Sequence, residues 1–225
     1  MKTIVGFVGT KGSGKTTAKN IMKEYASVLG YNVVELSFST LLKQFCADIT
    51  GKHIDHFNNP ETKDSLNLSV ITSNDEHILV RPRNIMTEIA KTVRSIHKNA
   101  FVNYTINYIN NYENPPEFDC TLFIIDDIRQ ENEFKAIEDL NGTLIFMNQD
   151  AETLYQKIRR NIRLNGPLIL RNTNPTEYGL NHLYDKTHHF SIDNTDKSCY
   201  NNLTETIKAI VSSDFDLYLY NTRRK

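Results

Sequence analysis

Short apolar runs alternate with segments of helical spacing along the first third of the chain. Residues 3–8 form a β-branched apolar run that ends at Gly9, and residues 31–36 form a second such run. Between them, residues 16–29 repeat apolar side chains at helical spacing and stop before Gly30, a residue typical of helix ends. This alternation predicts an α/β fold whose strands form a parallel sheet.

The middle of the chain contains helical patterns on both sides of a polar segment. Helical spacing recurs in residues 40–49, 83–96 and 101–112. Residues 52–80 are polar and lack a sustained period. We therefore expect this segment to leave the core, with a hairpin in its last part, within residues 70–80.

The last part of the chain returns to the alternating pattern. Residues 121–125 form the clearest buried strand, and Asp126 and Asp127 follow it directly. The other predicted elements are helix 130–140, strand 143–147, basic helix 154–164, strand 189–192 and helix 203–211. Together the elements predict a three-layer α/β fold with helices on both faces of a central parallel sheet.

Composition excludes several classes of protein. The 225 residues carry a formal net charge of -1, which argues against a nucleic-acid coat protein and a polybasic membrane binder. No apolar stretch approaches the ~20 residues that span a bilayer. The 3 cysteines are widely spaced and form no CxxC pair, which argues against a zinc ribbon and a disulfide framework. We expect a cytoplasmic protein without a membrane or polymeric nucleic acid as partner.

A phosphate-binding motif lies between the first strand and the first helix. Residues Gly9 to Thr16 match GxxxxGK[ST] in full. Glycines allow the backbone to turn successive N–H groups toward phosphate oxygens, Lys15 would reach the β- and γ-phosphates, and the Thr16 hydroxyl would bind Mg²⁺. The residues assigned to nucleotide binding here are Gly9, Lys11, Gly12, Ser13, Gly14, Lys15, Thr16 and Thr17.

Acidic side chains end the clearest strand. A site that transfers a phosphoryl group from a nucleoside triphosphate needs a carboxylate near the metal and the transferred group. Asp126 and Asp127 occupy a strand end, which is where open α/β sheets bind ligands. Arg129 follows, and Glu133 lies four residues later, a spacing at which the two side chains could form an ion pair. Alternation does not decide which aspartate faces the site, because both faces of the strand are buried.

A basic segment follows the strand at residues 143–147. Lys157, Arg159, Arg160 and Arg163 fall within one helical stretch, where the three arginines can share a face. Such cations can form a mobile lid that surrounds a transferring phosphoryl group. A solvated basic helix explains the same pattern, and the sequence leaves both interpretations open.

With these motifs in place, the sequence resembles the phage deoxynucleoside monophosphate kinases, within the wider nucleoside monophosphate kinase group. Besides the loop followed by Thr17, the resemblance rests on Phe38-Ser-Thr-Leu-Leu-Lys43, Arg83-Asn-Ile-Met-Thr-Glu-Ile89 and Ile125-Asp-Asp-Ile-Arg-Gln-Glu-Asn-Glu133, with weaker matches at residues 174–177 and 192–194. Asn174 and Ala90 stand where the family often has His and Gly, which leaves the choice of acceptor open.

The resemblance implies transfer of the γ-phosphoryl group of ATP, with Mg²⁺, to a deoxynucleoside 5′-monophosphate. It implies one P-loop kinase domain over residues 1–225, with a monophosphate-binding region at 52–112 and a lid at 151–178, and it suggests a homodimer in the host cytoplasm. The implied catalytic residues are Lys15, Asp127, Arg129 and Arg160, and the metal ligands are Thr16 and Asp127. Arg159 and Arg163 would bind ATP, and the substrate-binding candidates are Lys43, Arg83, Arg94, Arg129, Glu133 and Glu177.

Two other functions fit the same motifs. The chain could be a P-loop kinase for another phosphomonoester, such as dephospho-coenzyme A or phosphomevalonate. It could also be a nucleotide-dependent switch or ATPase, although the Asn-Lys-x-Asp motif of regulatory GTPases does not occur in the sequence. A nucleic-acid 5′-kinase is disfavoured by the near-neutral charge.

Overall fold

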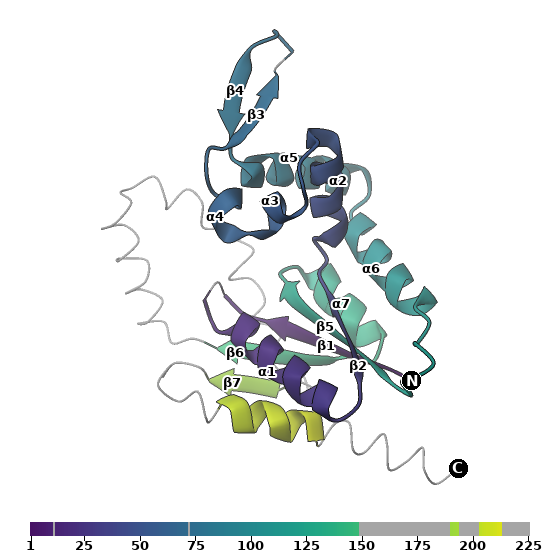
Figure 1. Cartoon of the computed structure of the whole chain (residues 1–225). Coiled ribbons are helices and arrows are strands. Elements are labelled where there is room, and N and C mark those ends of the chain that lie inside the picture. Colours follow the sequence, from purple (N-terminus) through teal and green to yellow (C-terminus); the bar gives the residue numbers. More distant parts are fainter. Residues whose placement is uncertain (11, 72, 149–189, 194–202, 213–225) are drawn as a thin grey trace. The chain divides into compact units, whose positions relative to one another are not determined.

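The computed structural model of the chain describes residues 1–225 except 11, 72, 149–189, 194–202 and 213–225 (Figure 1). It divides into two compact units, which we describe separately. The sheet unit consists of Met1–Leu36 and Tyr112–Lys225, and the helical unit is Ser37–Asn111. The predicted lid at residues 151–178 lies outside the described residues, and the predicted domain boundaries remain a prediction.

A parallel sheet forms the centre of the sheet unit, as the sequence predicts. In the described part of the chain it has five strands in the order β2-β5-β1-β6-β7, and every neighbouring pair is parallel. The strands are β1 (Lys2–Val8), β2 (Asn32–Leu36), β5 (Thr121–Ile128), β6 (Thr143–Asn148) and β7 (Phe190–Asp193). The central position of β1 places the start of the phosphate-binding motif between β5 and β6.

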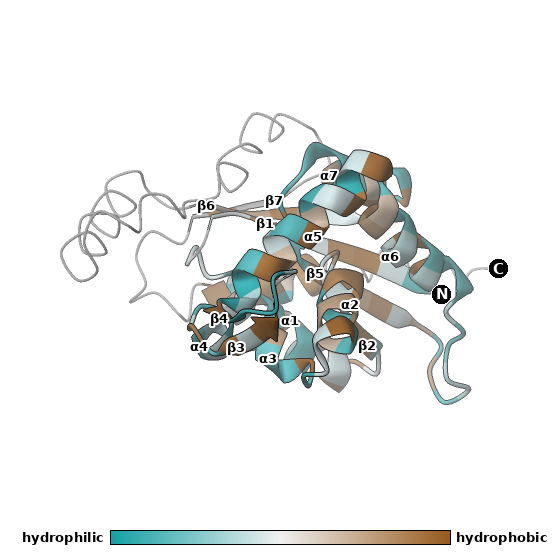
Figure 2. Cartoon of the chain, turned by 90° about the horizontal axis from the view of Figure 1, so that it is seen from above, coloured by the Kyte–Doolittle hydropathy of each residue, from teal (hydrophilic) through white to brown (hydrophobic). Residues whose placement is uncertain are grey.

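Helices cover both faces of this sheet. On one face, α1 (Lys15–Val28) and the helix at residues 203–212 pack on Val5 and Phe7 of β1 and on their neighbours in the adjacent strands. On the other face, α7 (Glu131–Asp139) contacts β1 and β6. The β1 residues Ile4 to Val8 are all buried, because a central parallel strand has an apolar layer on each side, and β1 is brown in Figure 2.

A bulge interrupts the pairing of β5 with β1 at the end of the sheet that carries the motif. Gly6 aligns with Ile125 and Val8 aligns with Ile128, so Asp126 and Asp127 together oppose a single β1 residue. Bulges of this kind redirect side chains and are common next to active sites. Beyond the bulge, the end of the Ile128 side chain packs where a Cβ on Gly6 would lie, so a larger residue at position 6 would displace it.

The helical unit has a core of its own. Its buried residues include Leu42, Cys46, Phe57, Leu68 and Phe101. Its elements are α2 (Thr40–Thr50), α3 (Asp55–Asn58), α4 (Pro60–Lys63), β3 (Leu68–Ile71), β4 (His77–Val80), α5 (Pro82–Ile96) and α6 (Ala100–Asn111). The antiparallel pairing of β3 with β4 confirms the predicted hairpin, whereas the sequence analysis did not anticipate α3 and α4.

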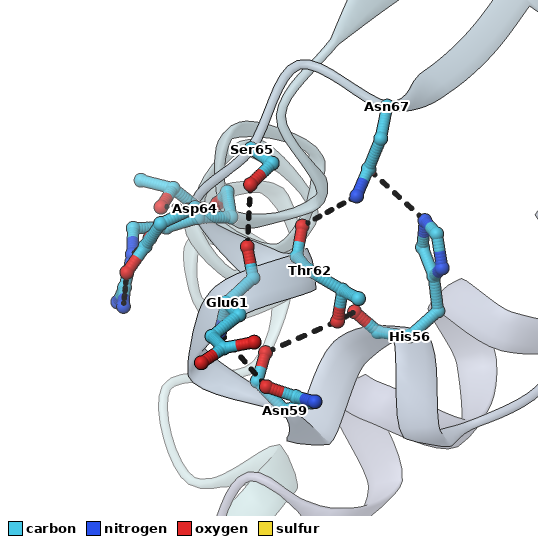
Figure 3. A network of polar contacts seen from close by, with 9 residues as sticks. His56, Asn59, Glu61, Thr62, Asp64, Ser65 and Asn67 are labelled. Atoms are coloured by element: carbon cyan, nitrogen blue, oxygen red, sulfur yellow. Dashed lines mark hydrogen bonds and ion pairs between the residues drawn. The ribbon is translucent and has the colours of Figure 1, made fainter.

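Short-range hydrogen bonds give the polar segment before the hairpin its structure (Figure 3). Asn59 Oδ1 accepts from Glu61 N at 2.8 Å and caps α4, which begins at Pro60. Thr62 Oγ1 donates to the His56 carbonyl at 3.0 Å, and Asn67 Nδ2 donates to the Thr62 carbonyl at 2.9 Å. Hydrogen bonds from side chains to the backbone thus hold this segment where other segments rely on apolar packing. Its sequence therefore shows no apolar period.

No helix within the described ranges is both long and apolar enough to cross a bilayer.

Candidate nucleotide-binding site

Backbone conformations that favour glycine shape the loop between β1 and α1. Gly12 has a φ of 82° and Gly14 a φ of 96°, both in the left-handed region that other residues rarely adopt. Gly14 is the N-cap of α1, and its carbonyl accepts from Ala18 N at 2.9 Å. The loop therefore turns directly into the positive end of a 14-residue helix, a backbone arrangement suited to an anionic phosphate.

The first glycine of the loop lies tightly against β6. A Cβ built on Gly9 would be 2.7 Å from the Met147 carbonyl oxygen and 2.7 Å from Ser13 Oγ. Ser13 itself is 1% exposed. The loop thus has a packed underside, which leaves its outer side for a ligand.

Lys15 extends over the loop that precedes it. Its Nζ donates to the carbonyl of Gly9 at 2.6 Å and to the carbonyl of Thr10 at 2.7 Å. These neutral acceptors are weaker partners for an ammonium group than phosphate oxygens are. A bound triphosphate would therefore take over at least part of this coordination. Thr16 and Thr17 follow at the exposed start of α1.

An ion-pair cluster, which we call the Lys19 cluster, connects α1 to two neighbouring strand ends. Lys19 Nζ lies 2.9 Å from Asp126 Oδ2 and 2.9 Å from Glu35 Oε2. Lys23 Nζ lies 2.5 Å from Glu35 Oε1. The sequence analysis missed Lys19, although its position one helical turn after Lys15 was a usable signal.

The Lys19 cluster shifts the ionisation of its members. Burial lowers the pKa of Lys19, but hydrogen bonds to Asp126 and Glu35 outweigh it, so the net pKa is raised. Hydrogen bonds from Lys23 and Lys19 hold the pKa of Glu35 below its ordinary value. Lys19 and Glu35 are therefore both charged near neutral pH.

The structure distinguishes the two aspartates of β5. Asp126 is bound to Lys19, whereas Asp127 is the half-buried neighbour in the same bulge. Arg129 comes directly after β5 and is exposed. The metal role predicted for Asp127 remains a prediction, and the structure offers a structural role for Asp126.

Glu133 has a position that the sequence analysis did not anticipate. It is 4% exposed, and its Oε2 accepts from Arg129 N at 2.8 Å and from Gln130 N at 3.1 Å. With Gln130 it forms the capping box of α7. The described carboxylate contacts are thus to the backbone N–H groups of Arg129 and Gln130, and substrate binding by Glu133 remains a prediction.

We expect Glu133→Ala to lower the free energy of unfolding by about 1–2 kcal/mol, because two partly buried N–H donors lose their acceptor. Chemical denaturation monitored by circular dichroism would measure this loss. Glu131→Ala, at an exposed position in the same helical turn, is the matched control. Equal stability of the two variants would contradict the capping role.

Three substrate-binding candidates belong to the helical unit. Arg83, in the first turn of α5, donates from Nε and Nη2 to the two carboxylate oxygens of Asp64, the second contact measuring 3.0 Å. The Arg94 guanidinium carbon lies 5.1 Å from the ring centre of Phe101. Lys43 is half-buried near the start of α2.

The remaining candidates lie outside the described residues. They are Lys11, Arg159, Arg160, Arg163 and Glu177. Their proposed roles in the loop, the lid and the substrate site remain predictions.

The donor atoms near the loop fit the predicted metal ion. Mg²⁺ prefers oxygen ligands, keeps several waters and is usually held by one or two protein groups together with substrate phosphates. The Thr16 hydroxyl and the Asp127 carboxylate are donors of this kind, on α1 and β5. Both elements border the loop, since α1 begins at its end and β5 pairs with β1.

No protein-family model and no curated protein sequence matches the sequence of this chain. Solved structures with a similar arrangement include TT1252 from Thermus thermophilus, at 15% identity and a TM-score of 0.48 over 94% of this chain and 97% of that one. A dephospho-CoA kinase from Campylobacter jejuni shares 12% identity, with a TM-score of 0.46 over 94% of this chain and 96% of that chain. A shikimate kinase from Acinetobacter baumannii shares 16% identity, with a TM-score of 0.45 over 95% of each chain. The fold class follows from the sheet and helices of the chain itself. It is α/β, with a central parallel sheet flanked by helices.

Proposed function

We propose that the chain is an ATP-dependent phosphotransferase whose acceptor is the phosphate group of a small molecule, with a deoxynucleoside 5′-monophosphate as the first candidate. The observation that carries the proposal is the glycine loop at the end of β1, with Lys15 over it and Asp127 on the neighbouring strand. Loop, cation and carboxylate are the parts that phosphoryl transfer from a nucleoside triphosphate requires.

The donor side of the reaction would use residues of the sheet unit. Loop N–H groups and Lys15 would hold the triphosphate, and Thr16 and Asp127 would hold Mg²⁺. When bound, Mg²⁺ neutralises charge on the β- and γ-phosphates. An acceptor phosphate oxygen would attack the γ-phosphorus, and the bond from that phosphorus to the β,γ-bridging oxygen would break, releasing ADP. The attacking oxygen is already anionic near neutral pH, so no strong general base is needed.

The acceptor side is supported by the positions of two cations in the helical unit. Arg83 lies in the first turn of α5, a 15-residue helix, and Lys43 lies near the start of α2. The positive end of a helix and a cation near it both favour a phosphate group. These helix starts are also the segments that resemble the deoxynucleoside monophosphate kinases, at residues 38–43 and 83–89.

A panel of acceptors tests the proposal. ADP release from ATP would be measured with each natural dNMP and NMP, with dephospho-coenzyme A and with phosphomevalonate. Stimulation by one or more dNMPs is the expected result. Stimulation only by another phosphomonoester would replace the acceptor, and acceptor-independent hydrolysis would favour an ATPase or switch.

With an active acceptor in hand, we expect Arg129→Ala to lower kcat/KM for that acceptor by about 10- to 100-fold, the loss of a charged hydrogen bond. Nucleotide affinity should stay close to that of the wild type. Lys135→Ala, which removes an exposed cation from α7, is the matched control. Unchanged acceptor kinetics in Arg129→Ala would remove this arginine from the site.

A further inference from the structure

The Lys19 cluster joins the two elements that carry the candidate metal ligands. Thr16 is on α1 and Asp127 is on β5. Lys19 is on the same helix as Thr16, and its Nζ lies 2.9 Å from the carboxylate of Asp126, the residue next to Asp127. The side chains of this pair are 16% and 23% exposed, so solvent screens their attraction less than at an open surface.

The geometry of the sheet and helix explains why Lys19 reaches this position. Side chains of an α-helix point back toward its N-terminus, so the Lys19 side chain is directed toward the loop end of α1. On the strands, Glu35 aligns with Ile124, and alternation puts Asp126 on the same face as Ile124. Two carboxylates on neighbouring strands would repel each other, and the ammonium group of Lys19 binds both.

Because Asp126 and Asp127 lie together in the bulge, the contact between Lys19 and Asp126 also constrains Asp127. Asp126 and Asp127 share the extra length of β5, where the ladder to β1 is interrupted. A strand segment with an interrupted ladder has fewer backbone hydrogen bonds to hold its conformation. The side chain of Asp126, tied to α1, supplies a replacement constraint directly next to Asp127.

We propose that Lys19 is a positioning residue of the phosphoryl-transfer site, which braces α1 against the β5 bulge and so fixes the distance and direction between Thr16 and Asp127. The inference rests on the proposed function for its meaning. Removing a group that hydrogen-bonds directly to a metal ligand typically changes metal affinity or activity by about 10- to 100-fold. Lys19 contacts the residue next to the ligand, so we expect the lower end of this range.

Manganese binding tests the brace without any acceptor. Mn²⁺ would be titrated into the full-length protein saturated with ADP, and free Mn²⁺ would be followed by electron paramagnetic resonance. We expect Lys19→Met to weaken Mn²⁺ binding by about 10-fold. Lys23→Met removes the same charge one turn further along α1, where the lysine contacts Glu35 but makes no described contact with Asp126, and should bind Mn²⁺ like the wild type.

Two further variants separate positioning from folding. Lys19→Arg retains the cation and should restore most of the Mn²⁺ affinity. Asp126→Asn should reproduce the Lys19→Met effect, and the double variant should be no weaker than the worse single variant, because both changes break the same contact. Asp126→Asn also provides the test if Lys19→Met does not fold.

The inference is overturned if Lys19→Met and Asp126→Asn bind Mn²⁺ as tightly as Lys23→Met and differ from it only in melting temperature. The cluster would then be a structural cross-link alone. This outcome is distinct from failure of the proposed function, since the Mn²⁺ titration with ADP uses no acceptor. A protein that binds Mn²⁺ and ADP but phosphorylates nothing would refute the kinase and still decide the role of Lys19.

Discussion

Replacing Lys15 by methionine is expected to lower the rate of phosphoryl transfer by about 10²- to 10³-fold, the effect of removing one donor to developing negative charge. Lys15 Nζ is directed onto the loop, 2.6 Å from the Gly9 carbonyl oxygen and 2.7 Å from that of Thr10. A triphosphate in the loop would place its oxygens within reach of the same ammonium group. Methionine retains much of the aliphatic length of lysine and removes the charge, so the loss would report on charge.

The measurement is kcat and KM for ATP by coupled ADP release, with the best acceptor from the panel. Lys23→Met serves as the control, because it makes the same substitution two turns further along α1. Wild-type kcat/KM in the Lys15→Met variant would contradict the assignment of the loop to the triphosphate.

The second large effect is expected for Gly9→Ala, which should destabilise the protein and weaken nucleotide binding together. The φ of Gly9 is 153°, and an added Cβ would lie 2.7 Å from the Met147 carbonyl oxygen. That carbonyl belongs to β6, where Met147 aligns with Ile192 of β7, so it is held by the sheet. The loop would have to move instead, at a cost of about 2–4 kcal/mol from overpacking and backbone strain.

Gly30→Ala is the matched control for this substitution. Gly30 also has a positive φ, 85°, but an added Cβ would meet nothing within 4 Å. Its expected cost is about 1 kcal/mol of backbone strain. Thermal melts and titration with a fluorescent ATP analogue would compare the two variants. If Gly9→Ala matched Gly30→Ala in both, the close packing of the loop on β6 would be wrong.

The centre of the sheet was predictable because β1 and β5 are buried on both faces. A central parallel strand must be a continuous apolar run, and residues 3–8 and 121–125 are such runs. The loop was predictable for a related reason, since its glycines are required by conformation and its lysine and threonine by chemistry. In both the strands and the loop, the residue type at each position is set by the burial, backbone conformation or chemistry of that position alone.

The Lys19 cluster and the Glu133 cap show what local patterns cannot supply. Lys19 contacts residues 16 and 107 positions away, and nothing in the spacing of charges states which carboxylate will be its partner. Glu133 was near enough to Arg129 to suggest a side-chain pair, whereas its contact with the backbone N–H group of Arg129 could not be read from the spacing. Polar side chains have several energetically similar partners, and the tertiary structure selects among them.

Parts of the helical unit could not be predicted from the sequence either. Its hairpin was expected from two apolar runs, whereas α3 and α4 are each only four residues long. Helices of that length cannot display a period, and their ends are held by side chains such as that of Asn59. The contact of Arg83 with Asp64 joins residues 19 positions apart and was likewise invisible in the sequence.

The central place of β1 has a consequence for how the protein is made. On the ribosome β1 is synthesised well before its two neighbours, β5 and β6, which begin at Thr121 and Thr143. The apolar strand and the loop after it must therefore wait unpaired while more than half of the chain is added, whereas the helical unit is continuous in sequence and needs only its own residues. Such a long-range pairing slows folding and leaves an aggregation-prone strand exposed during synthesis. The nascent protein would gain its ability to bind a triphosphate only after β5 and β6 have been synthesised.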